Sequence, residues 1–215
     1  MRVQLASCGI VLLMVTAMAQ TPGSSIKLVG DRFKPLVYSE MTPAQKAMTD
    51  HILAGERGGT MGGPFNVLLR SPDIGDVAQQ LGAQVRFHSS LPRNLNELAI
   101  IITARYWTAH YEWYAHKAAA LRAGLNPSIV DAVAAGKRPA SMQPDEEAVY
   151  TFCTELLETK QVSDATFRKA VTAFGERGVV DLIAVTGYYQ LVSMILNVDR
   201  YPLPEGATPE LTALK

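Results

Sequence analysis

The sequence predicts an all-α protein of about seven helices, and three observations carry this prediction. Apolar residues recur at helical spacing through most of the range 41–204. Helix signals divide that range, because a capping residue followed by Pro begins several segments and a Gly ends several of them. No stretch shows a convincing alternation of apolar and polar residues, which is typical of strands. With 215 residues, 48% of them hydrophobic, the chain is long enough for one well-cored domain, which we expect over 41–204.

The first 19 residues have the pattern of a secretory signal peptide. Arg2 is the basic start, Gly9 to Thr16 is the apolar core, and Ala17-Met18-Ala19 matches an A-x-A cleavage site. The apolar run is shorter than the roughly 20 residues that span a bilayer. We therefore expect an exported protein, periplasmic or secreted, without a membrane attachment once residues 1–19 are removed.

Two further segments flank the expected domain. Residues 20–40 form an N-terminal arm with few helix signals, and residues 205–215 form a short tail after a Pro-rich stretch. The formal net charge is zero, which gives no indication of nucleic-acid binding. Cys8 leaves with the signal peptide, so an internal disulfide is not expected. Cys153 lies in an amphipathic helical pattern, where a cysteine usually packs as a small apolar group.

The first helices are predicted from their start signals. Thr42-Pro43, with Gln45 three residues after the cap, begins a helix that ends near Gly55. The glycine-rich segment 56–72 is either a flexible surface loop or a lid that packs Phe65, Val67 and Leu68 inward. Ser71-Pro72 begins the next helix. The apolar face of that helix is expected to hold Val77, Leu81 and Val85.

The later helices follow the same logic. Asn126-Pro127 begins a short helix that ends at Gly136, and Pro144 to Thr159 is an amphipathic helix with an acidic first turn. Ser163-Asp164 begins another helix, which Gly175 ends. A second long apolar helix is expected over Glu176 to Asn197, where Gly187 indicates close helix packing.

The segment from Glu97 to Gly124 is the one around which we expect the chain to be organised. It holds both tryptophans and two of the four histidines, and no Pro or Gly interrupts it. A single helix of this length would extend about 40 Å. We therefore expect a break near Trp107-Thr108, with Thr108 capping a second helix. Glu97 also matches a capping box with Asn94, so a purely structural role for this carboxylate stays open.

Glu112 and His116 lie four residues apart, which places them on one helix face, one turn from each other. A carboxylate in contact with an imidazole suits proton transfer or metal binding. The expected break would let Glu97 converge on this pair from a neighbouring helix. Glu97, Glu112 and His116 are therefore the predicted catalytic residues. The predicted substrate contacts are Trp107, His110 and Tyr111.

Glu97, the cluster AHYEWYAH at 109–116 and the Ala-rich segment before Gly124 together resemble the carboxymuconolactone decarboxylase family, which shares its fold with alkylhydroperoxidase D. The resemblance runs from about Phe65 to Pro204. It implies an alkylhydroperoxidase D-like helical fold, a homo-oligomer and chemistry without a cofactor. In the peroxidase branch a Cys-x-x-Cys pair precedes the histidine, and those two positions hold Ala109 and Glu112 here.

Four functions remain open. The first is a decarboxylase-like lyase, or a related hydrolase, that acts on a small carboxylated substrate, aromatic-derived compounds included. In this function His116 would donate or accept the proton, and Glu112 would orient His116 or share its proton. A desolvated Glu97 would act as an acid. The second is a thiol peroxidase, which the missing Cys pair disfavours. The third is a metal site formed by the same three residues, although the family resemblance does not imply a metal. The fourth is an exported protein that binds a small apolar ligand or a partner without catalysis.

Overall fold

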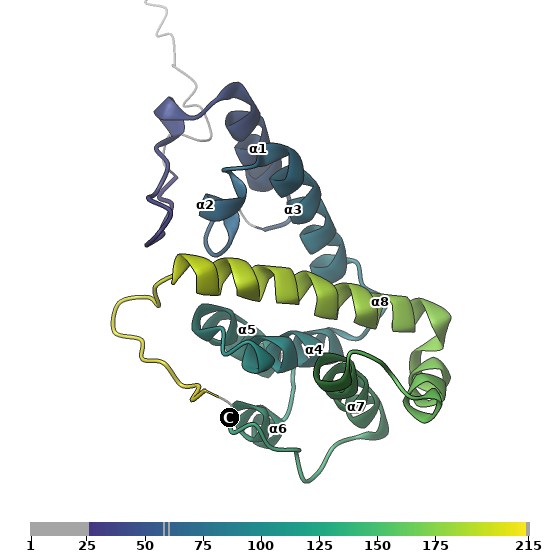
Figure 1. Cartoon of the computed structure of the whole chain (residues 1–215). Helices are drawn as coiled ribbons and strands as arrows, with labels where there is room; N and C mark the ends of the chain where they lie inside the picture. The colour runs from purple at the N-terminus through teal and green to yellow at the C-terminus, as the bar shows by residue number, and fades with distance from the viewer. Residues whose placement is uncertain (1–25, 58, 60, 214–215) are drawn as a thin grey trace, which may run out of the picture.

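The computed structural model describes residues 26–57, 59 and 61–213, and these residues form helices and no strand, so the all-α prediction is confirmed (Figure 1). The predicted signal peptide at 1–19, Cys8 and the start of the predicted arm lie outside the described residues. In chain order the described elements are the short 3-10 helix η2 (Tyr38–Glu40) and the helices α1 (Pro43–Ala54), α2 (Phe65–Leu68), α3 (Pro72–Phe87), α4 (Arg93–Tyr106), α5 (His110–Arg122), α6 (Pro127–Ala134), α7 (Pro144–Thr159) and α8 (Asp164–Asp199).

Helix α4 is the centre of the main core. It packs against α5, α6, α7 and α8, and Figure 1 shows α8 lying along one side of the α4–α5 pair. Every residue of α4 from Leu95 to Arg105 is buried. A helix with apolar side chains all round is stable only when it is covered on all sides, which is what the run from Leu98 to Ile102 predicts.

The predicted break in the central segment is confirmed. Helix α4 ends at Tyr106, and Thr108 adopts the left-handed conformation with φ of 48°. The Ala109 N–H donates to the Ala104 carbonyl at 2.9 Å, which closes the end of α4. The expected capping role of Thr108 is wrong in detail, because Thr108 ends α4 and Ala109 occupies the N-cap position of α5.

The alternative capping role of Glu97 is also wrong. Helix α4 already begins at Arg93, after Pro92, so Asn94 and Glu97 both lie inside the helix. The carboxylate of Glu97 is 2% exposed and faces the core instead of the backbone at the helix start. Its partner in that core is His116, described below.

Helices α1, α2 and α3 surround a second, smaller apolar cluster. The capping box predicted for α1 is present, since the Gln45 N–H donates to Thr42 Oγ1 at 3.3 Å and the Thr42 N–H to Gln45 Oε1 at 2.9 Å. From the glycine-rich segment, Phe65 and Leu68 are buried as the lid alternative requires, whereas Val67 is half-buried. This segment therefore packs back onto the domain.

The predicted apolar face of α3 is wrong. Val85 is buried, but Val77 is 67% exposed and Leu81 is 46% exposed. The face that packs inward carries smaller residues, among them Ala78 and Gly82. A Cβ on Gly82 would lie 2.1 Å from the Tyr188 hydroxyl, so any other residue here would require the Tyr188 side chain to shift. The inward face of α3 is therefore made largely of small residues, and the larger apolar side chains of Val77 and Leu81 face outward.

Helix α8 contains the interruption that the sequence predicts. Gly175 has φ of 69° and ψ of 174°, so the helix is kinked between an 11-residue start and a long second part. Half of its most apolar stretch is buried, as in a core helix, although its length and composition would also fit a membrane span. Gly187 does not mark close packing within this chain, because a Cβ there would meet nothing within 4 Å.

The predicted arm and tail both contact the domain. The Phe33 N–H donates to Asp199 Oδ1 at 2.8 Å, which joins the arm to the end of α8. In the tail, Glu210 accepts a hydrogen bond from the Trp113 indole at 3.1 Å, and Leu211 is buried in the main core. The two segments therefore close the ends of the domain near α5 and α8.

Candidate active site

Three predicted site residues converge on one imidazole. His116 Nδ1 lies 2.7 Å from Glu97 Oε2, and His116 Nε2 lies 3.0 Å from Glu112 Oε1. All three side chains are at most 6% exposed. The ring therefore lies between two carboxylates, with one at each nitrogen, in a nearly dry environment.

The local structure of α4 and α5 explains this arrangement. Glu112 and His116 lie one turn apart on α5, so their side chains meet on the same face. The left-handed residue Thr108 reverses the chain between the two helices and lays α5 against α4. Glu97, in the first half of α4, then lies opposite His116, although 19 residues separate them in the chain.

Hydrogen bonds at both nitrogens of His116 require two protons among the three groups. Either the imidazole carries both and is a cation, or one carboxyl is protonated and donates to a neutral ring. Burial alone would lower the pKa of His116, but the charges and hydrogen bonds of Glu112 and Glu97 raise it to about 9. The imidazolium between two carboxylates is therefore the form expected near neutral pH.

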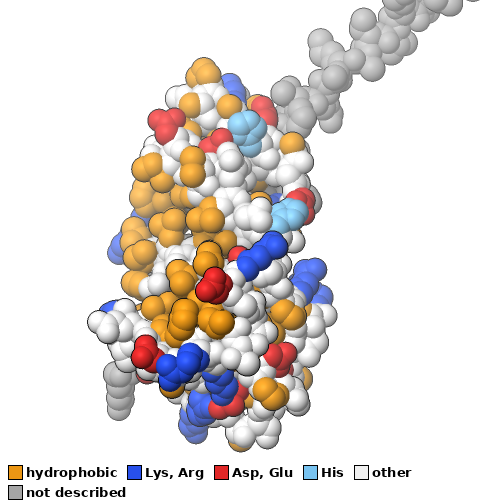
Figure 2. All heavy atoms as spheres, turned by 90° about the vertical axis from the view of Figure 1, so that its right-hand side faces the viewer, with side chains coloured by type: hydrophobic (Ala, Val, Ile, Leu, Met, Phe, Trp, Pro, Cys, Tyr) orange, Lys and Arg blue, Asp and Glu red, His pale blue; other side chains and the backbone are white. Residues whose placement is uncertain are grey.

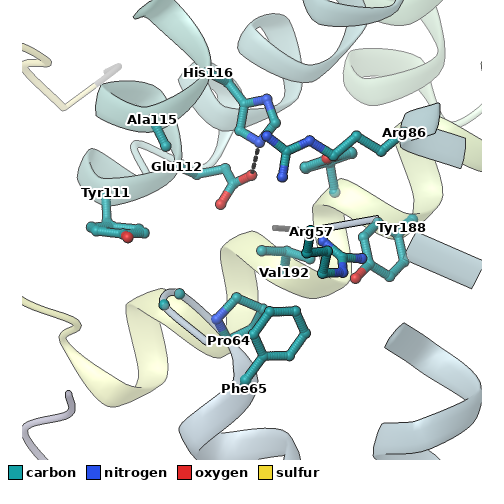
Figure 3. Close-up of a pocket in the computed structure, with 13 residues that line it drawn as sticks. Arg57, Pro64, Phe65, Arg86, Tyr111, Glu112, Ala115, His116, Tyr188 and Val192 are labelled. Carbon is teal, nitrogen blue, oxygen red and sulfur yellow. Dashed lines mark ion pairs between the residues drawn. The ribbon is translucent and has the colours of Figure 1, made fainter. Parts of the chain in front are cut away.

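A cavity of about 350 Å³ opens beside this group (Figure 3), within the size range of small-molecule sites. Glu112 and His116 form part of its wall, whereas Glu97 does not. A bound molecule can thus contact Glu112 and His116 directly, and Glu97 holds the imidazole from the core side. The other lining residues come from the glycine-rich segment, α3, α5 and α8: Arg57, Gly62, Gly63, Pro64, Phe65, Arg86, Tyr111, Ala115, Tyr188, Tyr189 and Val192.

Two tyrosines of α8 complete the wall next to the imidazole. The Tyr189 ring lies edge-on to His116 with centroids 4.9 Å apart, and it lies edge-on to Tyr188 at 5.3 Å. Burial, with the nearby carboxylate of Glu112, raises the pKa of Tyr189 well above its usual value. Both phenols therefore stay neutral and give the cavity an apolar, aromatic side with hydroxyl groups.

Tyr111 is the one predicted substrate contact that the structure places in this cavity. Its ring packs edge-on against Tyr201 at 4.4 Å, and the Tyr201 hydroxyl accepts a hydrogen bond from the Gly63 N–H at 3.0 Å. Burial raises the pKa of Tyr111 above its usual value. These contacts join the glycine-rich segment to the chain after α8, so the segment forms one side of the cavity.

Trp107 and His110, the other two predicted substrate contacts, lie outside the cavity. Trp107 is the C-cap residue of α4, and its carbonyl accepts a hydrogen bond from the Asn197 side-chain amide at 2.8 Å. His110 begins α5 and faces a separate hollow near the end of α8, shared with Tyr201. Six residues separate His110 from His116, which on a helix does not bring them to one face. The prediction that these two side chains contact a substrate is wrong for this cavity.

Sequence reasoning missed Arg57, Arg86, Tyr188 and Tyr189 as cavity residues. The Tyr188–Tyr189 pair was visible as an aromatic pair in an apolar helix, but its register relative to α5 depends on tertiary packing. Arg86 follows the buried Val85, and its position in the cavity wall depends on how α3 packs against α8. Nothing in the spacing of the chain indicated that Arg57 would reach the same cavity.

Cys153 lies in the core and does not line the cavity. Burial raises the pKa of its thiol to about 12, and its sulfur lies 3.5 Å from the Thr186 hydroxyl. A thiol of this kind is a poor nucleophile near neutral pH. Among the residues that the structure describes, no three acidic, histidine or cysteine side chains are arranged as metal ligands. Glu97 and Glu112 approach different nitrogens of His116, an arrangement that fits proton sharing.

The fold and this site define an all-α protein with a buried carboxylate–imidazole–carboxylate group on the wall of a small, partly aromatic cavity. Comparison of the chain with models of protein families gives no match, and comparison with curated proteins gives no significant similarity.

Proposed function

We propose that this protein is a cofactor-independent acid–base enzyme of the carboxymuconolactone decarboxylase type, with an alkylhydroperoxidase D-like fold. The observation that carries the proposal is the position of His116, held between Glu97 and Glu112 at the wall of a cavity. The substrate is a small carboxylated molecule, and aromatic-derived compounds fit the tyrosine-lined side. Decarboxylation, or a related lyase or hydrolase step, is the reaction.

The proposed chemistry needs one proton at the reacting carbon. Cleavage of the C–COO⁻ bond releases CO2 and leaves the electron pair on the substrate, where a neighbouring carbonyl delocalises it until a proton is added. The Glu112–His116 pair supplies that proton and recovers one from solvent, so each turnover consumes one proton. Glu97 does not touch the substrate; it keeps the imidazole oriented and supports its charge.

A substrate screen tests this function directly. Purified protein is incubated with carboxylated lactones and β-keto acids, and CO2 release and proton uptake are followed together. We expect turnover of at least one compound without added metal or cofactor. If none is turned over while native mass spectrometry finds a small molecule held unchanged, the protein is a ligand-binding protein and the enzymatic proposal is wrong.

Export belongs to the same proposal, because the expected signal peptide precedes the domain. We expect the protein recovered from cells that process such signals to begin at Gln20, after cleavage behind Ala19. The intact mass of the recovered protein measures this. A mass that still includes residues 1–19 would contradict cleavage at this site.

We further propose that the protein self-associates through α8. Its outward face carries Val180, Ile183, Leu191, Met194 and Val198, which are 37–61% exposed. With Gly187 among them, the steps along this face are 3, 4, 4, 3 and 4 residues, the spacing of a helix-pairing seam. Figure 2 shows hydrophobic side chains gathered over much of one side of the molecule, with few charged groups among them.

A second copy of the same chain is the partner that suits this face. Gly187 lies near the middle of the row and has open space around it, so two α8 helices could cross closely there about a two-fold axis. Five exposed apolar side chains in one row form a contiguous apolar patch, and such patches often mark interaction sites. In such an antiparallel pair, residues near the start of the row in one copy would contact residues near the end of the row in the other copy.

Light scattering after size exclusion tests self-association. We expect the wild-type chain to have at least the mass of a dimer and the variant Ile183→Glu, Leu191→Glu to have the mass of a monomer, because two charges on the seam would lose their hydration in the interface. Val37→Glu, at an exposed apolar residue outside α8, is the matched control and should leave the mass unchanged. A wild-type chain that stays monomeric at micromolar concentration would contradict the proposal.

A further inference from the structure

Two arginines line the cavity together with Glu112 and His116. Arg86 is at the end of α3 and Arg57 is in the segment after α1, and Figure 3 shows the Arg86 guanidinium extending toward Glu112 and His116. Arg57 lies over the Phe65 ring at 5.0 Å, and its Nη2 donates to the Gln79 carbonyl at 3.2 Å. The end of the cavity opposite Tyr111 is therefore basic.

The polar contacts of the Arg86 guanidinium are incomplete within the described part of the chain. No ion pair among the described residues involves Arg86, and its Nε is buried without a hydrogen-bond partner there. Its described contact is the neighbouring Phe87 ring at 5.3 Å. A buried donor without an acceptor is destabilising, so an acceptor supplied by a ligand would relieve that cost.

The charges around the cavity also favour an anion. The imidazolium of His116 and the guanidinium groups of Arg57 and Arg86 are three cations, against the two carboxylates of Glu97 and Glu112. Of these cations, Arg86 is one for which the described residues supply no ion pair. Glu112 is paired with His116 at 3.0 Å, and no ion pair in the described part of the chain joins Glu112 to Arg86.

We propose that Arg86, with Arg57 beside it, forms a carboxylate-binding subsite that holds the substrate by an anionic group. This inference rests on the proposed function, because it assigns the residues that orient the substrate in the same cavity. A guanidinium presents parallel N–H donors that match the two oxygens of a carboxylate. The bound carboxylate places the rest of a small, flat molecule against Phe65, Tyr188 and Val192, in the same cavity as Glu112 and His116.

The subsite also determines which carboxylate can be lost in a decarboxylation. An ion pair with Arg86 stabilises the carboxylate charge, and that charge disappears as CO2 leaves. A carboxylate held by Arg86 is therefore the one that stays on the product. Any group that reacts must be a second one, nearer to Glu112.

Binding of benzoate and of its neutral analogue benzamide to the full-length protein tests the subsite without any need for turnover. Isothermal titration should show tighter binding of benzoate than of benzamide. Arg86→Gln should weaken benzoate binding by about 10- to 100-fold, because a charge-assisted hydrogen-bonded pair is lost, and should leave benzamide binding unchanged. Arg122→Gln, at an exposed arginine of α5, is the matched control and should bind both compounds as the wild type does.

Two results would overturn the subsite. One is equal affinity of the wild-type protein for benzoate and benzamide, and a lack of benzoate binding at millimolar concentration has the same meaning. The other is a benzoate affinity that Arg86→Gln leaves unchanged. Circular dichroism of Arg86→Gln verifies the fold, and Arg86→Lys, which keeps the charge, should bind benzoate with intermediate affinity. Turnover in the substrate screen with either of these results would reject the subsite and leave the enzyme proposal standing. Carboxylate-specific binding without turnover in the screen would support the subsite and reject the enzyme proposal.

Discussion

Replacing Glu112 by Gln is expected to lower the turnover rate by about 100- to 10,000-fold, the usual contribution of a positioned general acid or base. The amide keeps the shape of the side chain but can neither carry the negative charge that stabilises the imidazolium nor exchange a proton with it. Glu112 also lines the cavity, so no other described carboxylate is in position to replace it. The rate of CO2 release from a substrate found by the screen measures the effect.

His116→Gln should show a loss of the same order, and the double variant should lose little more than either single one, because the two groups act as one unit. Glu147→Gln, at a partly exposed carboxylate of α7 that does not line the cavity, is the control and should keep the wild-type rate. Near wild-type turnover in Glu112→Gln, with the fold intact, would remove Glu112 from the proposed chemistry.

The second large effect is on stability. Glu97→Ala is expected to lower the free energy of unfolding by about 3–5 kcal/mol near pH 6, because it leaves a buried imidazolium without one of its two carboxylates. Glu97→Gln should lose less, since its amide oxygen can still accept the hydrogen bond from Nδ1. Urea denaturation followed by circular dichroism gives both values.

The pH dependence of this stability has a definite sign. The pKa of His116 is raised from about 6.5 in the unfolded chain to about 9 in the folded protein, so the folded state binds the extra proton more tightly. The resulting stabilisation is fully present below pH 6.5 and is lost as the pH rises through 9. The difference between wild type and Glu97→Ala should shrink over the same window. A difference that stays constant from pH 6 to pH 9.5 would show that Glu97 contributes by packing alone.

Local signals were sufficient for most of the helices. The capping box at Thr42 and Gln45, the kink at Gly175 and the break near Thr108 all depend on a few neighbouring residues, and all three are present. The pairing of Glu112 with His116 was equally local, because it follows from one helical turn. These features could therefore be predicted from the sequence.

Features that depend on how helices pack against each other were predicted less well. The face of α3 that packs inward is defined by Gly82 and its neighbours, which make room for Tyr188, whereas apolar size had favoured Val77 and Leu81. Arg57 and Arg86 reach the cavity only through that packing. The break near Thr108 predicts that Glu97 converges on His116. That Glu97 is buried inside α4, and does not cap the helix start, follows from the start of α4 at Arg93, which the sequence did not indicate.

The placement of aromatic residues shows the same limit. Trp107, His110 and Tyr111 follow each other closely in the chain, yet only Tyr111 faces the cavity. The chain reverses between Trp107 and His110, so these side chains point in different directions on either side of Thr108. A cluster in sequence is therefore a weak guide to a cluster in space wherever a helix ends inside it.

Nitrogen NMR of the protein labelled with ¹⁵N-histidine tests the central claim most directly, namely that His116 is an imidazolium shared between two carboxylates. The chain has four histidines, and His116→Gln assigns the signal of interest. We predict that His116 carries protons on both ring nitrogens at pH 8 and loses one with a midpoint near pH 9, and that Glu112→Gln moves this midpoint to lower pH. A His116 ring that is neutral at pH 8, or a midpoint that Glu112→Gln leaves unchanged, would contradict the proposed proton-sharing site.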